Sequence, residues 1–278
     1  MTSLSLANAR RSYDPGLLEI VAGLSILCLW LTLALGAPYF AGAAPNAIDL
    51  GVLMQPPSAD HLFGTDHLGR DVFARVLHAA RIDIWMGVAG VMAPMLIGVG
   101  IGLVSGYFGG LTDILMMRLV DITVAFPFFV LVIAIVGMLG PGLSNYFIAL
   151  ALVGWVSYAR LVRAQVLVLK NKEFVIAAQA LGYRAPVVML RHVLPNTLSG
   201  ILVYATTDAV LILLAGAGLG FLGLGVQPPT PEWGAMIADG QPYVVNAWWI
   251  CFFPGLAAIS LGFGFILTSD GLARVLGR

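Results

Sequence analysis

Residues 173–196 read EFVIAAQALGYRAPVVMLRHVLPN. This stretch contains charged residues, a glycine and two prolines, whereas the rest of the chain is strongly apolar. Its first part carries one apolar helix face at the i, i+3, i+4, i+7 spacing, formed by Phe174, Ala177, Ala178 and Leu181. Gly182 stands where this helix can end, because Gly adopts the left-handed conformation without steric cost. The pattern predicts a helix over 173–181 that is too short to cross a membrane.

The second half of the stretch predicts another short helix after a sharp bend. Pro186 suits the first turn of a helix, where its missing N–H costs no bond. We expect this helix to reach about Leu194, with Pro195 closing it before the next apolar run. A short amphipathic helix beside a membrane lies in the lipid interface or fills a groove on a partner protein. The narrow apolar face with two alanines favours close packing into a protein cleft.

The composition is that of a membrane protein. The 278 residues are 60% hydrophobic and 10% charged, whereas a soluble domain is about a quarter charged. A formal net charge of zero does not suggest nucleic-acid binding. Cys28 and Cys251 lie inside apolar runs, so we expect buried free thiols rather than a disulfide or a metal pair.

Six apolar runs approach the roughly 20 residues that a membrane-spanning helix needs. They cover about 17–37, 84–106, 119–139, 143–159, 198–226 and 247–268. The first run resembles a secretory signal, since Arg10 and Arg11 precede it and small residues follow it. Its apolar core is longer than that of a signal, so we expect a retained helix.

The basic residues predict the orientation. All but three of the 14 Lys and Arg residues lie in the terminal segments or in the loops at 107–118 and 160–197. The three exceptions are Arg70, Arg75 and Arg81. By the positive-inside rule both termini are cytoplasmic, and the segments 38–83 and 227–246 lie outside. The expected fold is all-α and polytopic, with six transmembrane helices.

An enzyme is disfavoured by the motifs. The chain contains no phosphate-binding GxxxxGK[ST] loop and no His, Cys, Asp or Glu cluster with metal-ligand spacing. His61, His67 and His78 share one outer segment, but their spacing does not suit one helix face. We expect no cofactor or metal in this chain.

Two glycine-rich stretches indicate close helix packing. Gly98, Gly102, Gly106 and Gly110 form small-xxx-small steps that let helix backbones approach in lipid. The fifth apolar run ends AGAGLGFLGLG and includes Gly216. This second stretch is compatible with tight packing, or with an unwound segment at the outer end of a pathway.

Two acids lie in or near the apolar runs. Asp121 follows Arg118 by one helical turn, which predicts a local ion pair at the cytoplasmic interface. Asp208 lies deeper, where an acid is costly and usually faces the bundle interior or a water-filled cavity. It either faces a pathway or hydrogen-bonds to Thr206, Thr207 or another helix. The candidate path-lining residues are Asp208, Asp121 and Gly216.

The loop resembles the signature of the permease subunits of ABC importers. That signature is E-A-A, three residues, Gly, nine residues, then I-x-L-P. This chain has Ala177-Ala178, Gly182 and Leu194-Pro195 at the required spacing. Ile176 and His192 replace the signature's Glu and Ile, so Glu173, one turn earlier, becomes the candidate carboxylate. Three more stretches resemble the dipeptide/oligopeptide branch, at 61–82, 105–127 and 220–240.

The resemblance implies a type I ABC importer transmembrane fold in the bacterial inner membrane. It divides the chain into 1–83, which holds an extra N-terminal span typical of the C-type subunit, and a permease core over 84–278. The implied partners are a second permease, two cytoplasmic ATPase subunits that bind ATP and Mg, and an external binding protein. The cargo would be a peptide, with nickel, glutathione or another small solute as the alternative.

The resemblance also assigns roles to residues. The predicted ATPase-coupling residues are Glu173, Ala177, Ala178, Gly182, Arg191, Leu194 and Pro195. On the outer side, Asp71 and Arg75 are spaced to support a helix that leads into the second span or docks the binding protein. Three prolines precede Trp233 in the 227–246 loop, which predicts a stiff loop for a binding protein or a gate. The candidate binding-protein contacts are Arg75 and Trp233.

Two rival classes remain open. A secondary transporter or channel would use inverted repeats and broken helices to bind a coupling ion. We find no pair of interrupted helices related by an internal repeat, and few charges within the spans. A purely structural membrane subunit is the other alternative.

Overall fold

Five long apolar helices form the body of the protein in the computed structural model, which describes residues 14–276. They are α1 (Pro15–Phe40), α2 (Val72–Phe108), the run of α5 (Leu143–Val153) with α6 (Trp155–Leu169), the run of α8 (Ala185–Val188) with α9 (Leu194–Phe221), and α11 (Trp249–Leu276). Each is long and apolar enough to cross a membrane. The described residues contain no β-strand, in agreement with the predicted all-α fold.

The apolar run at 119–139 is not one continuous helix. It is divided between α3 (Gly110–Val124) and α4 (Phe128–Leu139), which meet at an angle of 81°. Pro127 causes the break, because it lacks an N–H and disfavours the helical conformation in the residue before it. The described chain has the predicted six spans when this bent pair is counted as one.

Helices α2 and α6 pack closely through a seam of glycines. A Cβ atom on Gly102 would lie 2.5 Å from the carbonyl oxygen of Ala159, and one on Gly98 would meet the backbone of Trp155. Gly106 faces Val166 in the same way. The predicted close approach is confirmed for these three glycines, whereas the fourth, at residue 110, begins α3 and has open space beside it.

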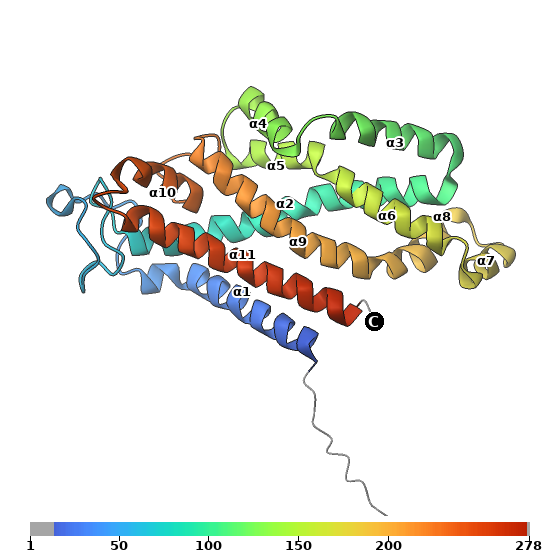
Figure 1. Cartoon of the computed structure of the whole chain (residues 1–278), viewed down its shortest axis with the longest axis horizontal. Coiled ribbons are helices and arrows are strands. Elements are labelled where there is room, and N and C mark those ends of the chain that lie inside the picture. The colour runs from blue at the N-terminus through green and yellow to red at the C-terminus, as the bar shows by residue number, and fades with distance from the viewer. Residues whose placement is uncertain (1–13, 277–278) are drawn as a thin grey trace, which may run out of the picture.

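The bundle is elongated, with α1 lying along α11 at one edge and α4, α5 and α6 at the other (Figure 1). Glu19 and Arg274 form an ion pair of 2.8 Å, so the beginning of α1 and the end of α11 are neighbours. Trp30 donates a hydrogen bond from its indole nitrogen to Ser260, which joins the two helices near mid-length. The predicted division between residues 83 and 84 falls inside α2, so both parts of the chain share this helix.

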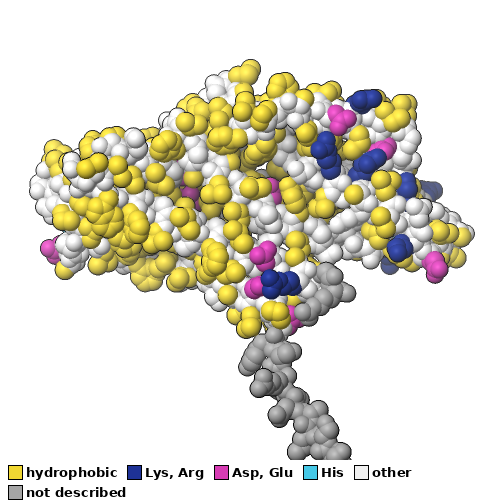
Figure 2. Space-filling view, viewed as in Figure 1, with side chains coloured by type: hydrophobic (Ala, Val, Ile, Leu, Met, Phe, Trp, Pro, Cys, Tyr) yellow, Lys and Arg dark blue, Asp and Glu magenta, His cyan; other side chains and the backbone are white. Residues whose placement is uncertain are grey.

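The two ends of the bundle differ in structure and charge. One end carries the short helix α7 (Glu173–Ala180), and we call it the α7 end. The other, the α10 end, carries α10 (Trp233–Gly240) and the irregular segment that follows α1, with 3-10 turns at Leu50–Val52 and Gln241–Tyr243 (Figure 1). Figure 2 shows Lys and Arg side chains gathered toward the α7 end, while the visible face toward the α10 end is mostly hydrophobic.

Predictions about the two cysteines need a correction, and some of the basic residues cannot be assessed. Cys28 and Cys251 are free, as expected, but Cys28 is exposed on the outward side of α1 rather than buried. A thiol tolerates this position because it behaves as a small hydrophobic group toward lipid. The basic residues at 10, 11 and 278, which contributed to the predicted orientation, lie outside the described residues.

Candidate functional site

Helix α7 ends in the way its sequence predicts. Gly182 has a φ of +82°, in the left-handed region. The Tyr183 N–H donates to the carbonyl of Ala178 at 3.2 Å, and the Gly182 N–H donates to that of Gln179 at 2.9 Å. These two bonds are a Schellman cap, which turns the chain sharply toward α8.

The inner face of α7 packs into a second, smaller hydrophobic core, which is separate from the main core of the bundle. Val175 and Ala178 are buried. This second core gathers residues from α2, α6, α7 and the α8–α9 run, namely Leu103, Val162, Val166, Val175, Ala178, Val188, Met189, Val193 and Ile201. Movement of α7 is therefore opposed by packing against three long helices.

The outer face of α7 and the turn after it expose apolar side chains. We call this surface the docking face; it consists of Phe174, Ile176, Leu181, Tyr183, Val187 and Leu190, all exposed. Of the apolar face predicted from the sequence, only Ala178 is buried within the chain, and its other members point outward. Glu173 and Arg191 are also exposed, and neither forms an ion pair with another described residue.

The second predicted short helix is not separate from the span that follows. A π-helical turn at Met189–Val193 joins α8 to α9, so one helix runs over Ala185–Phe221. The prediction that Pro195 ends a helix is wrong. The Leu194 N–H donates to the carbonyl of Met189 in the wider π turn, and Pro195 then occupies the first turn of α9, where its missing N–H is tolerated.

Polar contacts join the helices to one another at the α7 end. Gln179 on α7 donates to the Tyr107 hydroxyl on α2 at 3.1 Å. Arg163 on α6 holds Asp113 on α3 through two bonds of 2.5 and 2.6 Å. The sequence analysis missed this pair, because its members are separated by 50 residues and nothing local relates them.

Asp208 lies near the middle of α9 and lines a cavity of about 450 Å³. The Tyr158 hydroxyl on α6 donates to its Oδ2 at 2.8 Å. Thr206 bonds to the backbone of its own helix and Thr207 shares a bond with Ser269, so neither threonine accounts for the acid. The interpretation in which Asp208 bonds to a neighbouring helix is confirmed. That it faces a transport pathway stays a prediction.

The other two candidate path residues lie apart from this cavity. Gly216 faces Met86 and Tyr146 in the main core, and a Cβ there would lie 3.0 Å from the Met86 sulfur. Asp121 is exposed and lies 3.4 Å from Arg160 on α6. The predicted pairing of Asp121 with Arg118 is wrong, because the helix-to-helix partner lies closer than the one on its own helix.

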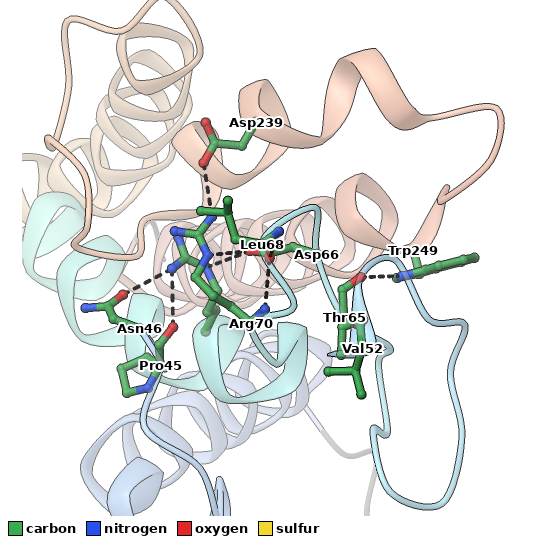
Figure 3. A network of polar contacts seen from close by, with 10 residues as sticks. Pro45, Asn46, Val52, Thr65, Asp66, Leu68, Arg70, Asp239 and Trp249 are labelled. Carbon is green, nitrogen blue, oxygen red and sulfur yellow. Dashed lines mark hydrogen bonds and ion pairs between the residues drawn. The ribbon is translucent and has the colours of Figure 1, made fainter. Parts of the chain in front are cut away.

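At the α10 end, a buried polar network includes Asp66 and Arg70 (Figure 3). Asp66 accepts from Arg70 at 2.6 Å and lies 3.9 Å from Arg75. Arg75 also donates to the Asn46 side chain at 3.1 Å. The expected helix-supporting pair of Asp71 with Arg75 does not form, because Asp71 caps α2 through the Ala74 N–H and also binds His61.

Trp233, the other outer candidate, is fully buried at the start of α10. Its indole nitrogen donates to the Val76 carbonyl at 3.1 Å, and its ring packs edge-on against Trp30. Because Arg75 is only 4% exposed, neither candidate reaches the surface in this chain. Both lie beneath the surface of the α10 end.

Two buried acids meet beside Trp233, and the sequence analysis missed them. Glu232 caps α10 by accepting from the N–H groups of Gly234 and Ala235 at 2.7 and 2.9 Å. Asp83 on α2 accepts from the Trp233 N–H at 3.3 Å, and the charge of Glu232 acts on it. Burial raises the pKa of Glu232. The sequence could have indicated Glu232 as a helix N-cap residue. Nothing near Asp83 in the sequence indicates that it lies beside Glu232.

The described residues hold no group of three or more His, Cys, Asp or Glu side chains that is arranged to bind a metal ion. The polar groups instead form hydrogen-bonded pairs and networks between helices. The described residues thus form an exposed apolar surface at one end, a cavity in the middle, and a buried polar network at the other end.

Comparison with known proteins assigns this chain to a family. Residues 98–278 match the family described as binding-protein-dependent transport system inner membrane component. The chain is 40% identical to the dipeptide transport system permease protein DppC of Alkalihalophilus pseudofirmus, over 92% of this chain and 84% of that protein. It is 42% identical to the oligopeptide transport system permease protein OppC of Bacillus subtilis, with the same coverage.

A third relative is the probable D,D-dipeptide transport system permease protein DdpC of Escherichia coli, 41% identical over 90% of this chain and 84% of that protein. The family match begins within α2 and includes α7, α9, α10 and α11. The chain therefore belongs to the binding-protein-dependent transport system inner membrane component family and is a multi-pass permease of the bacterial inner membrane.

Proposed function

We propose that this chain carries peptides across the inner membrane as one permease of an ATP-driven importer. The relatives are named for the transport of dipeptides or oligopeptides, which favours a peptide over nickel, glutathione or another small solute. The permease core over 84–278 would pair with a second, similar permease to enclose the path. This chain would contribute no catalytic residue, because ATP and Mg would be bound by the partner ATPase subunits.

The observation that carries the proposal is the docking face on a firmly packed base. Exposed apolar side chains gather on and just after α7 at the basic end of the bundle, where they are suited to fill a protein groove. Ala177 and Gly182 allow close approach there, and Glu173 and Arg191 provide charges at the rim. Ala178, Leu194 and Pro195 would act indirectly, by holding α7 and the start of α9 in position.

The outer end supports the second half of the proposal. An external binding protein would deliver the peptide onto the surface formed by α10 and the segment after α1. Arg75 and Trp233 would shape that surface from below rather than touch the binding protein. The gathering of Lys and Arg at the opposite end supports a cytoplasmic position for α7.

The test is a charge placed in the docking region. A Cβ atom on Gly182 would have no heavy atom within 4 Å, so Gly182→Asp meets no neighbouring atom, and the cost of a side chain at φ +82° is shared by the control below. We expect it to reduce peptide uptake at least about tenfold, because an unpaired charge would be buried against the ATPase. Uptake is measured in cells together with the amount of permease in the membrane.

Gly182→Asn is the matched control, since Asn tolerates the same backbone conformation and has nearly the same shape without the charge. We expect it to retain most of the uptake. Uptake at the normal rate by Gly182→Asp, at a normal membrane level, would contradict the docking proposal.

A further inference from the structure

The cavity beside Asp208 has the size and position of a ligand subsite. Its volume of about 450 Å³ lies in the range of small-molecule pockets. Asp208, Tyr204 and Leu211 on α9 line one side, Ser157 on α6 another, and Phe128 at the start of α4 a third. Three separate helices therefore converge on one space near the middle of the membrane-spanning region.

The charge in this cavity has no cationic partner within the described chain. Asp208 accepts one side-chain hydrogen bond, from Tyr158. No described Lys, Arg or His lies within ion-pair distance of it, although Asp66, Asp113 and Asp121 each have such a partner. A carboxylate inside a membrane protein is costly unless a cation, water or hydrogen-bond donors compensate for it.

The groups around Asp208 suit a small ammonium ion. The hydroxyls of Ser157 and Tyr204 line the same cavity and can accept hydrogen bonds from an N–H donor. Phe128 and Phe129 form an aromatic wall that can face a cation or the apolar side chain of a solute. The one bond from Tyr158 holds Oδ2, and Oδ1 accepts none from a described side chain.

We propose that Asp208, with the hydroxyls of Ser157 and Tyr204, binds the cationic amino group of the transported solute as it passes through the permease. Tyr158 is a positioning residue, because it orients the carboxylate from outside the lining of the cavity. If the solute is a peptide, the group bound is its free amino terminus, and this last step rests on the proposed function. A basic side chain of the second permease is the competing occupant.

The experiment measures the charge preference of the cavity in the assembled transporter. Leu211 lines the cavity and is exposed, so Leu211→Cys is introduced after Cys28→Ala and Cys251→Ala. The rates of modification by a cationic and an anionic methanethiosulfonate of similar size are compared. We expect the cationic reagent to react about 10-fold faster, because a charged cavity concentrates counter-ions. Adding Asp208→Asn should abolish this preference.

Two controls make the result specific. Ser58→Cys, in the exposed outer segment, should show a rate ratio that Asp208→Asn does not change. Tyr158→Phe should reduce the preference at Leu211→Cys without abolishing it, because the charge remains while its orientation loosens. Equal rates for both reagents with Asp208 intact would overturn the proposal and would be the result if the second permease supplied a basic side chain.

The assignment of the bound group as an amino group is tested by whether a peptide protects Leu211→Cys from labelling. A dipeptide with a free amino terminus should slow the labelling of Leu211→Cys, the N-acetylated dipeptide should not, and Asp208→Asn should remove the difference. Equal protection by both peptides, or by neither while uptake is normal, would overturn the amine assignment. Uptake of labelled dipeptide is measured separately. A cavity that prefers cations in a transporter without peptide uptake would contradict the proposed peptide function and leave the cation subsite standing.

Discussion

At Gly102 the distance between α2 and α6 depends on the absence of a single methyl group. A Cβ there would lie 2.5 Å from the Ala159 carbonyl oxygen and 2.9 Å from the Val162 Cβ. Both are atoms of a helix that cannot move without disturbing its other contacts. The same small-residue rule explains Gly98 and Gly106, so this part of the packing was predictable from spacing alone.

Gly102→Ala should therefore destabilise the assembled permease by about 1–3 kcal/mol, because the added methyl forces the two helices apart. Gly100→Ala is the matched control on the same helix, since a Cβ there would meet nothing within 4 Å. We expect the control to be neutral or slightly stabilising. The thermal midpoint of unfolding in detergent, measured for both variants, checks the difference. Equal midpoints for the two variants would contradict the close packing of α2 against α6 at Gly102.

Residue-scale prediction was limited by pairs that are distant in sequence. Gly182 was placed correctly because a helix cap depends on a few neighbouring residues. Asp208 could be recognised as unusual, but its bond to Tyr158 joins two helices across 50 residues. The partners of Asp121 and Arg75 were predicted wrongly for the same reason: helix periodicity suggested a near neighbour, and the fold supplied a different one.

At the scale of the element, α10 depends on the buried acid at its N-terminus. Glu232 accepts from the N–H groups of Gly234 and Ala235 and also meets Asp83. Two neighbouring buried carboxylates repel each other, so a proton on one of them is favoured. The attachment of α10 to α2 is thus linked to proton binding by this pair.

This linkage predicts a pH dependence. Because burial raises the pKa of Glu232 in the folded chain, its neutral form is favoured there, and the associated stability is present at low pH and lost as the pH rises through the raised pKa. Hydrogen-exchange protection factors of α10 should therefore fall from mildly acidic to mildly alkaline buffer.

Glu232→Gln should flatten this dependence, since the amide does not titrate and its one oxygen can still accept from a backbone N–H. Asp239→Asn is the control, because Asp239 lies near the exposed end of α10 and contacts Arg70 instead. It should keep the wild-type slope. A pH dependence that survives Glu232→Gln would assign the effect to another group.

Prolines show why element boundaries were only partly predictable. Pro127 breaks the third span into α3 and α4, whereas Pro195 stands in an unbroken helix. Apolar residues surround Pro127, and polar ones are among the neighbours of Pro195, but neither setting by itself indicates whether the helix breaks. The difference arises from the π turn before Pro195, which depends on packing of Met189 and Val193 in the second core.

For the whole molecule, the orientation in the membrane can be tested directly. In a background of Cys28→Ala and Cys251→Ala, Asn171→Cys lies two residues before α7 and Ser58→Cys in the segment between α1 and α2; both positions are exposed. In intact spheroplasts, a membrane-impermeant maleimide should label Ser58→Cys and leave Asn171→Cys unlabelled until the cells are lysed. Labelling of Asn171→Cys in intact spheroplasts would reverse the proposed orientation.

The continuous helix over Ala185–Phe221 also has a mechanical consequence. Its 37 residues span about 55 Å, with Asp208 about 35 Å from the docking end. A tilt of about 10° about one end displaces the other by roughly 10 Å at this length. If a partner protein holds α7, a small tilt of this helix would therefore move the lining of the cavity by several ångströms.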